Sequence, residues 1–384
     1  MNSIGARRWW ALAALDLGVL AVGLDVTVLS VALPTLATSL KASESDLQWF
    51  SSAYALVLAA GMLPAGVLGD RFGRKRVLLG ALAVFGAGSI GCAYAVNAGE
   101  FIAGRVLLGA AGAAIVVMAL SVMTVLFSEE ERPRAVGIWA AANFLALPIG
   151  PIFGGWLLTN YWWGWIFLMN VPVALLGILA VLLMVPESRA AKRPALDPLG
   201  MLSVTAGLVG ITYGLIELGR NGWTDGRSLI VLAAGIVLTV AFFAWERYLT
   251  VRAGRPLIDL SLFRSRGFTW GIVLAALGGL ALIGMVFTLP QYSQGVLGLN
   301  PEGAGVRLLP IIAGLIVGAV PADRIAQRVG AKVTVAVGFV ITAAGLIVGA
   351  TTAVDSNAWF VAAWMAMVGL GMGIGFATAA SAAL

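Results

Sequence analysis

Long apolar runs recur along the whole sequence, and they restrict what this chain can fold into. A run of 18 or more apolar residues can cross a hydrocarbon core of about 30 Å as an α-helix. Barrel strands do not fit, because they alternate apolar and polar residues over about ten positions. We therefore predict an all-α polytopic membrane protein with twelve transmembrane helices. Their expected ranges are 10–34, 47–69, 77–97, 101–126, 135–158, 164–185, 199–219, 228–248, 268–290, 304–321, 332–351 and 358–381.

Composition agrees with a membrane protein and removes several classes of function. Of the 384 residues, 60% are hydrophobic and 11% are charged, and the mean hydropathy is +0.98. Histidine is absent and Cys92 is the single cysteine. A zinc hydrolase, a histidine-based triad and a disulfide within the chain are therefore excluded. We expect no metal, no cofactor and no enzymatic activity.

The basic residues set the predicted orientation. Most of the 24 Lys and Arg residues fall in loops that face the cytoplasm if the N-terminus is cytoplasmic, as the positive-inside rule favours. This bias also explains the net charge of +6, so we expect no nucleic-acid partner. The excess of Arg over Lys, with abundant Ala and Gly, indicates a GC-rich bacterium. The expected location is the bacterial plasma (inner) membrane.

Two loops repeat one pattern. The stretches "GVLGDRFGRKRVLLG" (66–80) and "GAVPADRIAQRVGAKVTVAVG" (318–338) both place Asp-Arg at a helix exit, followed by a glycine and a basic residue. Two six-helix halves with two helices between them would give this spacing, and transporters are often built from repeated halves. We predict the following parts: an N-terminal six-helix half at 1–190, two inserted helices at 191–250, a cytoplasmic amphipathic linker at 251–267 and a C-terminal half at 268–384.

At this point the sequence resembles a known family. The loop at 66–78 is similar to the loop motif of the major facilitator superfamily through Gly66, Leu68, Asp70, Arg71, Gly73, Arg74, Lys75 and Leu78. The stretches "LDVTVLSVALP" (24–34) and "ALPIGPIFGG" (146–155) resemble the first-helix and fifth-helix signatures of its 14-helix drug:proton antiporter branch. Three shorter stretches also match this branch: "FLMNVPVAL" (167–175), "LDPLG" (196–200) and "PLIDLSLF" (256–263). By this resemblance the C-terminal half shows four helices, and the last two of the branch would be missing after Leu384.

The resemblance assigns the loop motif to a cytoplasmic gate. The gate motif comprises Gly66, Asp70, Arg71, Gly73, Arg74 and Lys75. Asp70 would pair with neighbouring arginines and with a helix N-terminus of the opposite half, and breaking that contact would open the site inward. A tight turn carrying topology-setting charges is the simpler alternative.

The resemblance also assigns an antiporter helix motif to the fifth span, consisting of Pro148, Gly150, Pro151, Gly154 and Gly155. The prolines can bend the helix and the glycines let a neighbour approach. In an antiporter this region would seal the pathway against proton leak. Close helix packing alone is the alternative.

Two ionisable residues within spans are the candidates for coupling. Asp25 lies in the first apolar run and Arg105 in the fourth, and ionisable residues at membrane depth usually mark substrate or proton pathways. Burial disfavours a charged carboxyl group and a nearby cation favours it, so Asp25 could exchange a proton for a cationic substrate. Asp25 could instead be a protonated packing residue, and Arg105 could snorkel to the outer interface. Asp16 is the weaker candidate, because nine residues place it half a turn away from Asp25.

These features together predict a proton-coupled efflux transporter that exports lipophilic, cationic drugs by alternating access. Its expected partners are protons, lipophilic cationic small molecules and membrane lipids. One alternative is a dedicated exporter of an endogenous product such as an antibiotic or lipid. Another is a truncated, non-transporting membrane scaffold or sensor.

Overall fold

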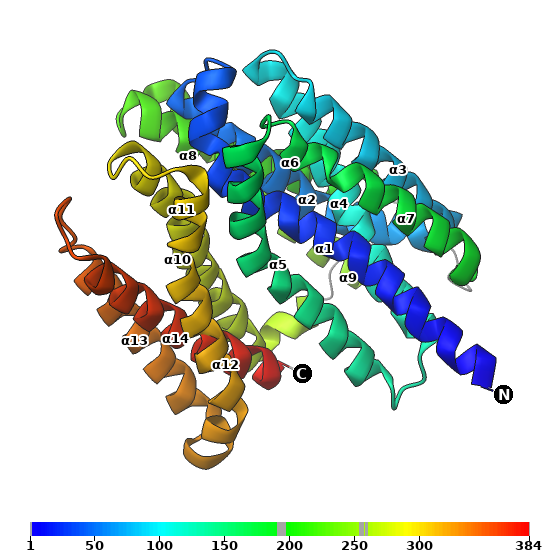
Figure 1. Ribbon diagram of the computed structural model, residues 1–384. Coiled ribbons are helices and arrows are strands. Elements are labelled where there is room, and N and C mark those ends of the chain that lie inside the picture. The colour runs from blue at the N-terminus through cyan, green and yellow to red at the C-terminus, as the bar shows by residue number, and fades with distance from the viewer. Residues whose placement is uncertain (1, 190–196, 253–256, 258–259, 384) are drawn as a thin grey trace. The chain divides into compact units, whose positions relative to one another are not determined.

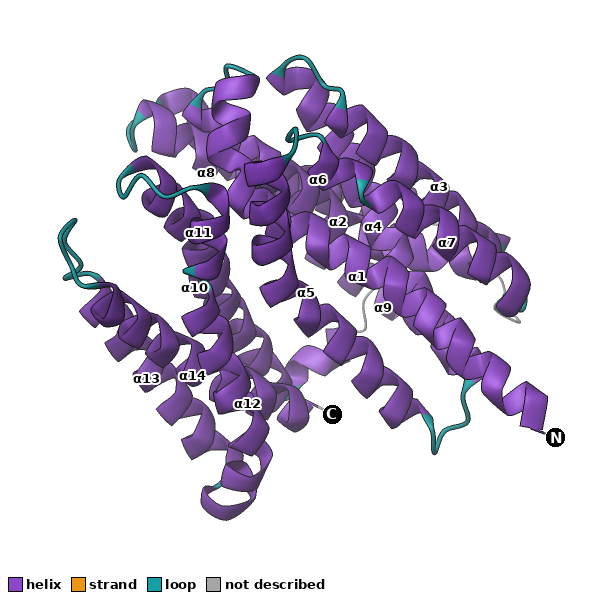
Figure 2. Ribbon diagram, in the orientation of Figure 1, coloured by secondary structure: helices purple, strands orange, loops and turns teal. Residues whose placement is uncertain are grey.

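The computed structural model describes residues 2–189, 197–252, 257 and 260–383. Every regular element in this described part is helical, as Figure 2 shows. The helices of the first part of the chain are α1 (Asn2–Ser39), α2 (Glu44–Phe72), α3 (Arg74–Ala93), α4 (Ala98–Leu126), α5 (Arg132–Asn160), α6 (Trp165–Leu168), α7 (Asn170–Met184), α8 (Pro198–Asn221) and α9 (Gly226–Arg252). The later elements are η1 (Leu260–Arg264), α10 (Arg266–Gly295), α11 (Pro301–Val306), α12 (Leu309–Val329), α13 (Ala331–Gly349) and α14 (Ala358–Ala383).

The predicted all-α membrane fold is confirmed. Within the described residues, eleven helical segments are long and apolar enough to cross a membrane. The twelfth predicted span, 135–158, lies within the 29-residue helix α5. The predicted span 164–185 is interrupted at Met169, which separates α6 from α7, and the predicted span 304–321 is divided between α11 and α12. Long apolar runs therefore located the spans but not their interruptions.

Polar residues fix where several helices begin. Ser43 and Asp46 form a capping box at the start of α2, in which each side chain accepts a hydrogen bond from the other residue's backbone amide. Asn97 and Asp197 cap α4 and α8 in the simpler way, through one side-chain oxygen. Ahead of α9, hydrogen bonds from the hydroxyl and backbone amide of Ser228 hold the pKa of Asp225 below its usual value.

The two repeated loops contain matching turns. Gly73 separates α2 from α3 with φ +113° and ψ +126°, and Gly330 separates α12 from α13 with φ +89° and ψ +143°. Residues with a Cβ atom rarely adopt this conformation, so glycine is required at both positions. The shared Asp-Arg…Gly…basic pattern therefore encodes a shared backbone turn.

The described chain forms two compact units. Unit 1 contains Met1–Leu29, Thr35–Ala146 and Asn160–Asp259. Within it α4 packs between α2 and α3, α7 packs against α3, and α8 pairs with α9 (Figure 1). The α8–α9 pair joins this unit through α2, where the rings of Trp49 and Tyr213 lie 5.9 Å apart. The two helices that were predicted as inserted thus pack on the N-terminal bundle.

Unit 2 contains Ser30–Pro34, Leu147–Thr159 and Leu260–Leu384. Its centre is α14, which packs against both α12 and α13. Gly369 and Gly373 of α14 lie against backbone carbonyls of α12, whereas Gly371 faces Gly338 of α13. Small residues let membrane helices approach this closely, which increases their van der Waals contact. An apolar cluster that includes Met285, Leu308, Trp364 and Met372 completes the core of this unit.

Candidate functional site

The structure brings Asp25 and Arg105 together. Asp25 of α1 is 2% exposed and Arg105 of α4 is 1% exposed, and a guanidinium nitrogen of Arg105 donates a hydrogen bond to Asp25 Oδ2. Among the ion pairs of the described residues, this one alone has both side chains fully buried. Arg105 therefore does not snorkel to the interface. The attraction between the two charges offsets part of the free-energy cost of removing them from water. A single buried charge would lack this compensation.

Helix α2 holds the guanidinium of Arg105 from the other side. Arg105 Nε donates a hydrogen bond to the backbone carbonyl of Phe50 at 2.8 Å, and Cζ lies 4.3 Å from the ring centroid of Tyr54. The Tyr54 hydroxyl donates to the carbonyl of Val22 on α1 at 3.3 Å. Glycine in α4 makes this approach possible, because a Cβ atom at Gly109 would lie 2.6 Å from the Tyr54 carbonyl oxygen. The arginine is thereby fixed in place by several independent contacts.

Asn170 of α7 is a further member of the site. Its side-chain nitrogen lies 3.4 Å from Asp25 Oδ1 and 3.4 Å from the hydroxyl oxygen of Ser89 on α3, and the residue is 1% exposed. Asn170 received no role from the sequence, although it is the one amide in the stretch "FLMNVPVAL". An amide side chain within an apolar span is the sequence feature that could have identified it as a site residue. The site thus draws polar groups from α1, α2, α3, α4 and α7, all within unit 1.

The chemistry of this site is that of one carboxylate and one fixed cation. No group of three or more His, Cys, Asp or Glu side chains that could hold a metal occurs in the part of the chain that the structure describes. A carboxylate can be neutralised by its arginine, by a proton or by another cation. The site can therefore exchange one positive species for another.

The gate motif is tied together by hydrogen bonds. Asp70 Oδ1 accepts from Arg74 Nε at 3.1 Å and from Arg74 Nη2 at 2.9 Å, and Arg74 Nη1 donates to the carbonyl of Ser121 on α4 at 3.1 Å. Lys75 Nζ donates to the carbonyl of Leu182 at 2.8 Å. The guanidinium of Arg71 lies over the ring of Phe72, and Gly66 leaves ordinary contact distance to Val117. The motif thus connects α2 and α3 with both α4 and α7.

Glu187, just after α7, is the acidic partner that the sequence reasoning missed. Its Oε1 accepts a hydrogen bond from the backbone amide of Lys75 at 3.2 Å, and its Oε2 lies 3.5 Å from Arg76 Nε. A Cβ atom at Gly73 would lie 2.6 Å from Glu187 Oε1, so this glycine leaves room for the carboxylate. The sequence feature that could have identified Glu187 is an acidic residue directly after a span, where that span ends on the same side of the membrane as the basic loop.

The antiporter helix motif lies at a close backbone contact inside unit 2. A Cβ atom at Gly155 would lie 2.6 Å from the carbonyl oxygen of Pro301, and one at Gly305 would overlap the carbonyl of Pro151. Gly150 and Gly154 are also buried. The side chain of Pro148 lies outside the described residues. The motif therefore brings this part of α5 against α11.

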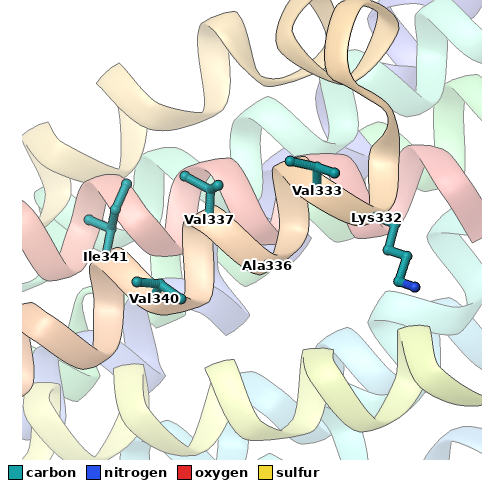
Figure 3. Close-up of a pocket in the computed structure, with 6 residues that line it drawn as sticks. All are labelled: Lys332, Val333, Ala336, Val337, Val340 and Ile341. Atoms are coloured by element: carbon teal, nitrogen blue, oxygen red, sulfur yellow. The ribbon is translucent and has the colours of Figure 1, made fainter.

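An open apolar depression of about 440 Å³ lies on α13 and includes no predicted site residue. Figure 3 shows Lys332 at one end of its lining, followed along the helix by Val333, Val337 and Val340. It offers one charged group and no polar partner for a ligand. We do not assign a function to it.

The sequence is similar to those of bacterial export proteins. It is 34% identical over 372 residues to the tetracenomycin C resistance and export protein of Streptomyces glaucescens, which covers 97% of this chain and 68% of that protein. It is also 34% identical over 347 residues to the multidrug efflux pump LfrA of Mycolicibacterium smegmatis, covering 89% of this chain and 67% of the pump. The chain thus spans about two thirds of the length of these relatives.

The fold is shared with solved transporters. A crystal structure of a D-xylose-proton symporter superimposes with a TM-score of 0.65 at 15% identity, over 96% of this chain and 80% of the symporter. The sequence model described as Major Facilitator Superfamily matches residues 15–384. The chain therefore belongs to the Major Facilitator Superfamily and is a multi-pass membrane protein of a transporter family, not an enzyme.

Proposed function

We propose that this protein is a proton-coupled efflux transporter that exports lipophilic, cationic drugs from a bacterial cell by alternating access. The observation that carries the proposal is the buried ion pair between Asp25 and Arg105. The names of the relatives, which include a multidrug efflux pump, support export as the activity. The expected location is the inner membrane, with the N-terminus in the cytoplasm, as the positive-inside rule favours.

Exchange at Asp25 gives a mechanism for coupling. A proton on Asp25 removes the negative charge that holds Arg105, whereas a bound organic cation competes with the proton for the same carboxylate. Proton and drug therefore exclude one another, which is the requirement for antiport. Asn170 can donate a hydrogen bond to either form of the carboxyl group, because an ionised and a protonated carboxyl group both keep an acceptor oxygen.

The gate motif supplies the proposed conformational step. Asp70 and Arg74 pair on the same face of the α2–α3 turn, and Glu187 ties that turn to the end of α7. These contacts let the turn move as one piece with the N-terminal helices during alternating access. A membrane potential of about 100 mV would contribute about 2.3 kcal/mol for each charge moved.

A dedicated exporter of one endogenous product is the second candidate. The relative from Streptomyces glaucescens favours it, because that protein is named for resistance to and export of a single compound, tetracenomycin C. The two candidates differ in breadth. Efflux of several unrelated cations would support the multidrug proposal, and efflux restricted to one neutral or anionic compound would support the dedicated exporter.

Inverted membrane vesicles from cells that express the protein provide the test. We expect a proton gradient to drive uptake of ethidium, a fluorescent cation, and an uncoupler to abolish it. Uptake that persists after the gradient has collapsed would contradict proton coupling. Vesicles from cells without the protein are the control.

A further inference from the structure

A second buried carboxylate lies in α1, nine residues before Asp25. Asp16 is 8% exposed, and its Oδ1 accepts no hydrogen bond from any residue that the structure describes. Asp25, by contrast, has Arg105 and Asn170 as partners. An ionised carboxylate that is buried without a partner is far more costly than a neutral one. The two carboxylates of α1 therefore lie in opposite electrostatic surroundings.

The direction in which Asp16 faces follows from the helix period. Eleven residues are about three turns, so Asp16 and Thr27 lie within about 20° of the same face of α1. The Thr27 hydroxyl donates to the carbonyl of Ala146 on α5 at 3.0 Å. Nearer the start of α1, Arg8 pairs with Glu131, directly before α5, at 2.6 Å. These two contacts show that α1 and α5 run in the same direction, and they place Asp16 opposite residues 135–139 of α5.

The neighbouring segments offer Asp16 little charge. Between Arg134 and Asn160, the sequence of α5 contains no charged residue. Close to Asp16 on α1, a Cβ atom at Gly18 would contact the apolar side chains of Leu82 on α3 and Ile115 on α4.

The basic residues of this region have partners or lie at its edge. Arg8 is held by Glu131, and Arg132 donates to the carbonyls of Phe127 and Thr124. Arg74 at the start of α3 is held by Asp70, and Arg105 of α4 by Asp25. Arg134 precedes the charge-free stretch of α5, and its side chain lies outside the described residues.

We propose that Asp16 is a second proton-binding site, which holds a proton while Asp25 is charged and paired with Arg105. The proton forms the O–H bond of a carboxylic acid and is returned to water when the site opens. Its meaning for transport rests on the proposed proton-coupled efflux. Asp16 would then lie on the proton's route along α1, about 13 Å from Asp25 by helical rise.

Infrared spectroscopy of the purified protein tests this site through the proton alone. A protonated carboxylic acid has a carbonyl stretch that an ionised carboxylate lacks. We expect such a band at neutral pH, and we expect Asp16→Asn to remove it. Asp25→Asn should leave the band in place, as should Asp355→Asn, which changes an exposed carboxylate. Loss of the band in Asp25→Asn with retention in Asp16→Asn would overturn the proposal.

A second variant covers a failure of Asp16→Asn to fold. Asp16→Glu keeps the carboxyl group and should shift the frequency of the band without removing it. An unchanged band in Asp16→Glu contradicts the proposal, as does its absence from the wild-type protein, which would show Asp16 ionised and paired with a residue such as Arg134. The vesicle assay is a separate readout. An infrared band from Asp16 without proton-driven efflux would refute the proposed function, but the proposed proton-binding site at Asp16 would still stand.

Discussion

The carboxylate of Asp25 on α1 is bound to the guanidinium of Arg105 on α4, and both side chains are fully buried. Asn170 contacts the second oxygen of the same carboxylate at 3.4 Å. Each partner leaves a different group unpaired when it is removed. Single substitutions can therefore test the contribution of each residue of the site separately.

Replacement of Asp25 tests its role in coupling. Asp25→Asn should abolish cation efflux and remove the pH dependence of substrate binding, because the amide keeps the volume of the carboxyl group but cannot take up a proton. Asp25→Glu should retain partial efflux, because it displaces the ionisable group by only one methylene, roughly 1.5 Å. Proton-driven uptake of ethidium into inverted vesicles measures both. A purely structural Asp25 gives the reverse order, with Asn tolerated and Glu disruptive.

Removal of Arg105 should destabilise the protein. Arg105→Leu leaves Asp25 buried without its counter-charge, and breaking such a pair costs about 3–5 kcal/mol. We expect a lower midpoint of thermal unfolding in detergent, and the double variant with Asp25→Asn should recover much of the loss. The matched control is Arg76→Leu, which removes an exposed ion pair with Glu187 and should cost at most about 1 kcal/mol. Equal losses in both variants would show that the buried pair is not special.

Two replacements of Tyr54 separate its contacts. Tyr54→Phe keeps the ring under Arg105 and loses the hydrogen bond to Val22, which should cost about 1 kcal/mol of stability. Tyr54→Leu also loses the cation–π contact, which adds about 2 kcal/mol in a desolvated site. Thermal unfolding of both variants measures the difference. The same stability for Phe and Leu would show that the ring does not hold the guanidinium.

The turn between α2 and α3 should tolerate no side chain. Gly73→Ala places a Cβ atom against Glu187 and forces alanine into a sparsely populated backbone conformation, which costs about 1–3 kcal/mol. We expect reduced yield of folded protein and reduced efflux. Gly80→Ala within α3 is the control, because its Cβ atom meets nothing within 4 Å and alanine favours a helix. Normal folding and efflux of Gly73→Ala would refute this account.

The gate proposal predicts loss of transport without loss of insertion. Asp70→Asn should stop the transport cycle while the protein still reaches the membrane, since the change affects a half-exposed pair at a turn and not a span. Quantification of the protein in membranes, together with vesicle uptake, separates the two effects. Unaltered uptake by the variant would count against a gating role.

The sequence predicted the membrane helices well, because apolar length is a local property that each segment carries by itself. It predicted Asp25 and Arg105 as candidates for the same reason, since a charge in an apolar run is visible without a structure. The depth of Arg105 was ambiguous, because a long side chain can either snorkel or turn inward. Only the contacts with Asp25, Phe50 and Tyr54 decide between these two positions.

The remaining residues depend on contacts between distant segments. Asn170 and Glu187 act through partners 145 and 112 positions away, which no local pattern encodes. The interruption at Met169 was missed because α6 and α7 are both apolar, so hydropathy runs through it without a change. From the sequence, Asp16 was the weaker candidate for coupling, because it lies on the opposite face of the helix from Asp25. That opposite face is the one directed toward the uncharged stretch of α5.

The spacing of glycines in α14 has a mechanical consequence. Gly369 and Gly373 receive carbonyls of α12, and Gly371 receives a carbonyl of α13, so the helix is notched on two sides at alternate positions. A slide of one residue in either direction would bring Leu370 or Met372 onto a neighbouring backbone where only a hydrogen atom fits. The close contacts at these glycines therefore oppose sliding of the three helices past one another. In the proposed transport cycle, any movement of unit 2 should therefore carry α12, α13 and α14 together.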